Sequence, residues 1–205
     1  LAGDWLGDAD ARISSAAGEH RPRLRPHAPG LRQRLWYGGG SLRSARWAAE
    51  NGFHLLVGNL NTGEATDDFF VAQRRHIEAF RSDWRGEDEP KIAVGRVIVP
   101  LDGADTVTRQ RYRDYAASRY ERTLAPQGER RTLFTPDLVG TAAEIVERLV
   151  ADPVLPLVDT LRLELPYNFS IADYRQIIGD FVALIAPALG WRNAEPVHRR
   201  KAVGE

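Results

Sequence analysis

The feature that most constrains the fold is an apolar run at residues 91–101, KIAVGRVIVPL. β-Branched and other apolar residues fill it almost continuously, without the regular polar alternation of a half-exposed strand. Such a strand is covered on both faces, as in a parallel sheet flanked by helices. The run therefore predicts a buried central strand in an α/β fold.

Strand-like and helix-like segments alternate along the rest of the chain. The expected strands are residues 35–37, 53–57, 91–101 and 158–168. The expected helices are residues 41–51, 65–84, 106–124, 141–152 and 170–191, with 125–138 as a looser charged segment. In the last helix, Ile177, Ile178, Phe181, Val182 and Ile185 are expected to face inward. This alternation indicates βα units and a parallel sheet.

Helix boundaries are marked by capping residues. Thr141 is followed three residues later by Glu144, which is the capping-box spacing, and Ser170 can cap the last helix. Gly52 suits the position just after the end of the first expected helix.

Four βα units make up half of a (β/α)₈ barrel, a fold that typically needs about 250 residues. A small, open, doubly wound sheet is the alternative. The sequence contains no methionine, even at position 1, which favours a chain cut at its front and hence the C-terminal half of a barrel. Residues 1–33 are expected to be an irregular connector, residues 34–192 the half barrel and residues 193–205 a tail.

Composition excludes several function classes. The formal net charge is zero, so no global field attracts nucleic acid or an anionic membrane. The absence of cysteine excludes disulfides and thiolate chemistry, and the histidines share no metal-ligand spacing. No apolar run approaches the roughly 18 residues that would span a bilayer, and the N-terminus lacks a signal-peptide layout. The cytoplasm is therefore the expected compartment.

The strongest candidate site is the turn YGGGSLRS at residues 37–44. Gly39 and Gly40 let the backbone approach a ligand, and Ser41 and Ser44 add hydroxyl groups one turn apart at the start of a helix. Free N–H groups and the positive end of the helix dipole favour an anion there. The stretch has the ingredients of a phosphate site but is neither a Walker loop nor a dinucleotide fingerprint. A tight turn capped by Ser41 is the other interpretation.

Other candidates are less specific. His54 lies in an apolar strand, which favours a structural role at the core or its rim over a catalytic base. Glu164 is expected near the C-terminal end of the last strand, followed by Tyr167 and Asn168. In a barrel this is the functional face. These residues could line a ligand site or simply close the strand.

Taken in order, three stretches resemble the C-terminal half of the bacterial luciferase-like flavin-dependent monooxygenases, over roughly residues 32–192. The stretches are RLWYGGGSLRSARWAAENGFHLLVG, LVGTAAEIVERL and VDTLRLELP. The residues that carry the match are Gly39, Gly40, Ser41, Ser44, Ala48, Ala49 and Gly52, and the run at 139–146.

The resemblance implies a (β/α)₈ barrel that uses reduced FMN or, in one branch, coenzyme F420. It implies that Gly39, Gly40, Ser41 and Ser44 bind the cofactor phosphate, that residues 106–138 form a variable insertion, and that the full-length protein is a homodimer. The family's early strands, with the usual catalytic histidine, have no counterpart here. No catalytic residue is therefore assigned.

The leading hypothesis is part of a flavin-dependent oxidoreductase that acts on paired donors with O₂ and oxygenates a small organic substrate. Two alternatives are an F420-dependent hydride-transfer enzyme of the same fold and a non-catalytic half-barrel interaction module. A half barrel alone is expected to be inactive and, with open strand edges, to self-associate.

Overall fold

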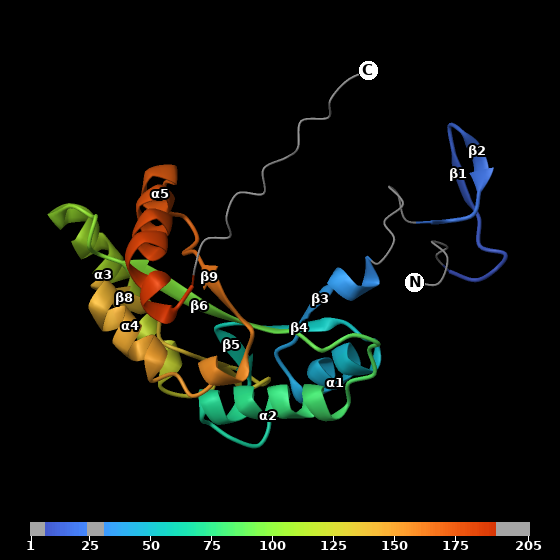
Figure 1. Ribbon diagram of the computed structural model, residues 1–205, viewed down its shortest axis with the longest axis horizontal. Coiled ribbons are helices and arrows are strands. Elements are labelled where there is room, and N and C mark those ends of the chain that lie inside the picture. The colour runs from blue at the N-terminus through green and yellow to red at the C-terminus, as the bar shows by residue number, and fades with distance from the viewer. Residues whose placement is uncertain (1–6, 24–30, 192–205) are drawn as a thin grey trace.

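The computed structural model describes residues 7–23 and 31–191 (Figure 1). Within the segment expected to be an irregular connector, β1 (Ile13–Ser15) and β2 (Gly18–His20) form an antiparallel hairpin. Gly18 has a φ of +98°, a conformation that glycine adopts without steric cost and that this tight turn requires. The expectation was therefore wrong for residues 13–20. The proline-rich residues 24–30 and the expected tail at 193–205 lie outside the described residues.

Within the described residues, the main sheet has five strands, and all of its strand pairs are parallel. Four of them lie side by side in the order in which they occur along the chain. Its successive strands are β3 (Trp36–Gly38), β4 (His54–Val57), β6 (Ile92–Pro100) and β9 (Thr160–Glu164). The expected buried strand, β6, is central and pairs with β4 on one edge and β9 on the other. The order of these four strands shows no reversal, whereas a reversal is the hallmark of a doubly wound sheet.

Besides β1 and β2, three further short strands of the described residues were not expected. β8 (Leu138–Gly140) pairs in parallel with the last three residues of β6. β5 (Leu60–Thr62) pairs antiparallel with β7 (Thr132–Phe134). Part of the segment 125–138, which was expected to be loose, is therefore hydrogen-bonded to the residues that follow β4. Each strand has only three residues, too few to show a reliable period.

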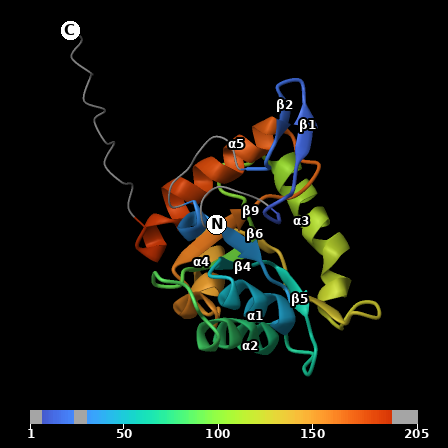
Figure 2. The same ribbon diagram turned by 90° about the vertical axis from the view of Figure 1, so that its right-hand side faces the viewer.

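The part of the chain that the structure describes contains five α-helices, four between strands and one after the last strand. They are α1 (Leu42–Glu50), α2 (Phe69–Ser82), α3 (Thr106–Tyr120), α4 (Ala142–Val150) and α5 (Ile171–Asp180). Short 3-10 segments lie at Arg32–Arg34, Glu121–Thr123, Leu155–Leu157 and Pro187–Leu189, and a π-helical segment at Phe181–Ile185. In Figure 1, helices α1 and α2 lie below the sheet, and α3, α4 and α5 are grouped at its left-hand end. Figure 2 shows α5 above β6 and β9, on the side of the strands away from α1 and α2.

The helices begin where the capping residues predict. Thr141 and Glu144 form the expected capping box, and Ser170 forms a second with Asp173. Helix α2 begins later than expected, at Phe69 rather than residue 65. The reason is Asp68, whose carboxylate accepts hydrogen bonds from the N–H groups of Phe70 and Val71.

The main core lies between the sheet and helices α1 and α2. Its buried members are Ala45, Ala48, Ala49, Leu55, Val57, Ile77, Phe80, Ile92, Val94 and Val154. Alanine at the buried face of α1 lets the helix backbone approach the strands closely. This packing positions the β3–α1 turn rigidly against the sheet.

Arg96 is a charged residue inside this region, with only 1% of its surface exposed. Its Nε donates to Asp152 at 2.8 Å and its Nη2 to Gln73 at 2.7 Å. Gln73 in turn donates to the carbonyl of Gly58, at the end of β4. The network ties α2, β6 and the segment after α4 together beneath the end of β4.

The inward face of the last helix differs from the expectation. Ile177 and Ile185 are fully buried, but Ile178 and Val182 are 43% and 39% exposed. Val182 lies in the π-helical segment Phe181–Ile185, whose wider turn changes which side chains face the core. Ile178 lies before it in α5, next to the buried Ile177 but about 100° further around the helix.

Within the described residues, no helix is long and apolar enough to cross a membrane. The same part of the chain contains no cluster of three or more residues suited to holding a metal ion.

Candidate functional site

The glycine turn follows the C-terminal end of β3 and leads directly into α1. A Cβ added to Gly39 would lie 2.8 Å from Cδ1 of the buried Leu55, so a side chain there would force Leu55 to shift within the core. A Cβ added to Gly40 would meet nothing closer than 3.8 Å. Packing against Leu55 therefore accounts for glycine at position 39. Packing does not account for glycine at position 40, where the absence of a side chain leaves the backbone accessible.

Ser41 and Ser44 form a capping box at the start of α1. The Ser44 N–H donates to Ser41 Oγ at 3.1 Å, and the Ser41 N–H donates to Ser44 Oγ at 3.0 Å. The two hydroxyl oxygens are 2.9 Å apart. The structure thus brings together both predicted serines, and each already satisfies an N–H group of the other.

A carboxylate from elsewhere in the chain occupies the same helix terminus. The N–H of Leu42 donates to Glu64 Oε1 at 2.9 Å. The second oxygen of Glu64 lies 3.0 Å from Nε2 of His76, whose side chain is fully buried. Sequence reasoning did not find Glu64, because it lies 22 residues away and belongs to no motif.

Glu64 holds this position with a strained backbone. Its φ is +32°, in the region that side-chain-bearing residues rarely adopt. Such strain persists only where surrounding contacts enforce it, and it is frequent at ligand sites. Here the bonds to Leu42 and His76 are the contacts that hold the residue.

The donor set at this terminus suits an oxyanion. A helix N-terminus carries a partial positive charge, and Glu64 shows that an anionic oxygen fits against the amide of Leu42. Among the described residues, the amides of Gly40 and Arg43 have no hydrogen-bond partner. A phosphate group therefore fits the chemistry of the site, provided that Glu64 withdraws from Leu42.

A second group of residues lies on the open face of the sheet. Glu164 ends β9, as the sequence predicts, and accepts a hydrogen bond from Arg162 at 2.5 Å. A Cβ on Gly95 would lie 1.8 Å from its carboxylate oxygen, and one on Gly58 would lie 3.4 Å away. The two glycines thus make room for a charged pair across β4, β6 and β9. Tyr167, the next candidate, is 84% exposed and lines no part of this group.

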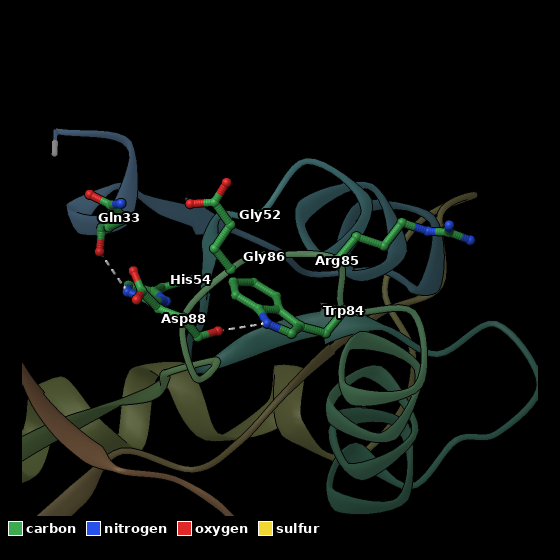
Figure 3. Close-up of a pocket in the computed structure, with 8 residues that line it drawn as sticks. Gln33, Gly52, His54, Trp84, Arg85, Gly86 and Asp88 are labelled. Atoms are coloured by element: carbon green, nitrogen blue, oxygen red, sulfur yellow. Dashed lines mark hydrogen bonds between the residues drawn. The ribbon is translucent and has the colours of Figure 1, made fainter. Parts of the chain in front are cut away.

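His54 lies at the opposite end of the strands, in a shallow pocket of about 130 Å³ (Figure 3). The Lys91 N–H donates to its Nδ1 at 3.2 Å, so the ring proton is on Nε2, which donates to the Gln33 carbonyl at 2.9 Å. The ring also stacks on Trp84 at a centroid distance of 6.1 Å. Both ring nitrogens are engaged, and His54 has the structural role that the sequence predicts.

No protein-family model and no curated protein sequence matches the chain. Solved structures do match. The monooxygenase RslO1 from Streptomyces bottropensis is 16% identical, with a TM-score of 0.52 over 89% of this chain and 56% of its own. Apo-MsnO8 is 15% identical, with a TM-score of 0.50 over 84% of this chain and 55% of its own.

A more distant match is the oxygenating constituent of 3,6-diketocamphane monooxygenase from Pseudomonas putida, solved with FMN, which is 15% identical. Its TM-score is 0.44 over 87% of this chain and 58% of its own. The chain thus spans little more than half the length of these three proteins. It shares an α/β fold with RslO1 and MsnO8.

Proposed function

We propose that this chain forms the C-terminal half of a (β/α)₈ barrel of a luciferase-like, flavin-dependent monooxygenase. The observation that carries the proposal is the set of parallel pairs β3 with β4, β4 with β6, and β6 with β9, with the Gly40–Ser41 turn after the C-terminal end of β3. In such barrels the active site lies at this end of the strands, and later βα loops frequently bind phosphate. The fold shared with RslO1 supports the assignment.

In this proposal the N-terminus of α1 binds the FMN phosphate. The amides of Gly40 and Arg43 donate to phosphate oxygens, and the hydroxyls of Ser41 and Ser44 turn from each other toward the ligand. Glu64 leaves the Leu42 amide, which then becomes a further donor. Bound reduced FMN supplies the reaction with O₂ that oxygenates a small organic substrate. This chain anchors and orients the cofactor, and none of its residues is assigned to the chemical step.

Gly40→Val tests the proposal, because Gly40 has room for a side chain without disturbing the core. The valine would cover the open amides. We expect FMN affinity to fall at least tenfold, while riboflavin, which lacks the phosphate, loses little. Gly179→Val is the matched control, since Gly179 also has free space and lies far along the chain in α5.

Unchanged FMN affinity in a folded Gly40→Val protein would overturn the phosphate assignment. Binding of F420 but not of FMN would redirect the proposal to the hydride-transfer alternative, and oxygen uptake with the reduced cofactor separates the two reactions. Binding of neither cofactor, even when this chain is joined to an N-terminal half barrel, would favour the non-catalytic module.

A further inference from the structure

A second polar pocket lies within the segment between β6 and α4, away from the α1 terminus. Its volume is about 250 Å³, and it is bounded by the end of α3, the residues before β8, and α4. Three arginines line it, Arg119, Arg122 and Arg148, and Asp137 is the one carboxylate among its lining residues. The pocket wall thus carries a formal excess of two positive charges.

Asp137 is engaged mainly by one of these arginines. Its side chain is 2% exposed, and Arg119 donates to its two oxygens at 2.5 and 3.3 Å. The nearest nitrogen of Arg122 is 4.0 Å away, beyond hydrogen-bonding distance. The carboxylate therefore neutralises Arg119 more fully than Arg122.

Arg122 is left with an unmet hydrogen-bonding requirement. Its Nε is buried and has no hydrogen-bond partner within the described part of the chain. Its guanidinium lies over the Phe134 ring at 4.3 Å from the centroid, which fixes its orientation. Burial, followed by the neighbouring Arg119, lowers the pKa of Arg122 from its ordinary value. A buried donor of this kind costs stability, so the protein contacts of Arg122 do not satisfy its guanidinium completely.

Arg148 adds a third cation from the opposite wall. Its Nη2 donates to the carbonyl of Val139 at 2.8 Å and its Nε to that of Glu144 at 3.3 Å. The charge of the Glu144 carboxylate acts on Arg148 and partly offsets it, while that carboxylate accepts a hydrogen bond from the Thr141 N–H at 2.7 Å. Carbonyl oxygens satisfy hydrogen bonds but do not neutralise the guanidinium.

We propose that this pocket binds a small molecule through an oxyanion group, either a carboxylate or a phosphate. Arg122, whose side chain is 27% exposed, contributes the accessible end of its guanidinium, and Arg119 and Arg148 supply the remaining charge. The planar fork of arginine matches both anions. A volume of about 250 Å³ is below the usual range for cofactor sites, so the ligand is a small acid or phosphate ester rather than a flavin. None of the lining residues belongs to the proposed FMN site.

The test is a titration of the 205-residue protein, followed by NMR of the Thr135 and Val139 amides. Inorganic phosphate and malonate are added separately at constant ionic strength, with chloride as the reference salt. We expect saturable shifts with at least one of the two anions and none with chloride. Saturation by phosphate alone identifies a phosphate site, and saturation by malonate alone identifies a carboxylate site.

Arg122→Gln is expected to weaken this binding about tenfold or more, because it removes both the charge and the guanidinium fork. Arg130→Gln, at an exposed arginine of the neighbouring loop, is the matched control and should bind as the parent does. If Arg122→Gln fails to fold, Arg148→Gln provides the second variant. Absence of saturable shifts with both anions, or undiminished binding in folded Arg122→Gln, would overturn the proposal.

Discussion

Glu64 accepts a hydrogen bond at 2.9 Å from the backbone N–H of Leu42, at the helix terminus where a phosphate is expected. The contact shows that the site favours anions and that the chain supplies one of its own. A phosphate must therefore compete with this carboxylate. His76 holds the other oxygen of Glu64, so the competition also breaks a bond to a buried ring.

Replacing Glu64 with glutamine is expected to strengthen phosphate binding. The neutral amide is a weaker acceptor for the Leu42 N–H and does not repel the incoming anion. We expect FMN to bind severalfold more tightly, with riboflavin almost unchanged, in parallel fluorescence titrations. Glu78→Gln, an exposed glutamate on the same helix as His76, is the control. Equal or weaker FMN binding by Glu64→Gln would argue that Glu64 helps to build the site rather than to block it.

The buried ion pair of Arg96 and Asp152 is expected to be important for stability. Asp152→Asn keeps the size of the side chain but leaves the guanidinium of Arg96 without its counter-charge inside the core. Breaking one side of such a pair costs about 3–5 kcal/mol, which urea denaturation would measure as a lowered free energy of unfolding. Replacing both residues with leucine should cost less than the single change. A double variant less stable than Asp152→Asn would contradict this account.

Local features of the fold could be predicted from the sequence because their determinants lie within a few residues. Ser41, Thr141 and Ser170 each cap a helix with a partner three positions later, and the sequence displays that spacing directly. The apolar run of β6 likewise specifies a buried strand without reference to the rest of the chain.

Features that depend on distant segments could not be predicted in this way. Glu64 reaches Leu42 because backbone hydrogen bonds fix the turn that carries it. One of them runs from the Gly63 N–H to the carbonyl of Arg131, a residue 68 positions further along the chain. Likewise, β5 is a strand only because β7 pairs with it. The orphaned Nε of Arg122 depends on where Asp137 and Phe134 come to lie. Sequence spacing contains no signal for any of these contacts.

The stability of the α3–α5 contact is expected to depend on pH through Asp173. Two hydrogen bonds from Arg111, at 2.6 and 2.9 Å, are the largest cause that holds the pKa of Asp173 well below its ordinary value. Ser170 and Tyr112 add to the shift, while burial opposes it. A carboxyl with a depressed pKa in the folded state stabilises the fold above its unfolded pKa of about 3.9.

Asp173→Asn should therefore be less stable than the parent at neutral pH. The gap in unfolding free energy should stay constant down to about pH 5 and shrink as the pH falls below about 4. Denaturant titrations at several pH values would measure it, with Asp114→Asn on the exposed face of α3 as the control. A gap that is the same at pH 2 and pH 7 would mean that the carboxylate charge contributes nothing.

We expect that a side chain at position 95 is disfavoured because it would collide with the Glu164 carboxylate, and not because the strand conformation needs glycine. A Cβ at this position would fall 1.8 Å from Glu164 Oε1, so alanine must push the carboxylate away from Arg162. We expect Gly95→Ala to lower the free energy of unfolding by about 1 kcal/mol. Gly179→Ala, at a helical glycine with free space around it, should instead raise it by about 0.5–1 kcal/mol. If the clash with Glu164 causes this loss of stability, Gly95→Ala should cost little in a protein that already carries Glu164→Ala. If the effects of the two substitutions on the free energy of unfolding simply add, the clash is not the cause.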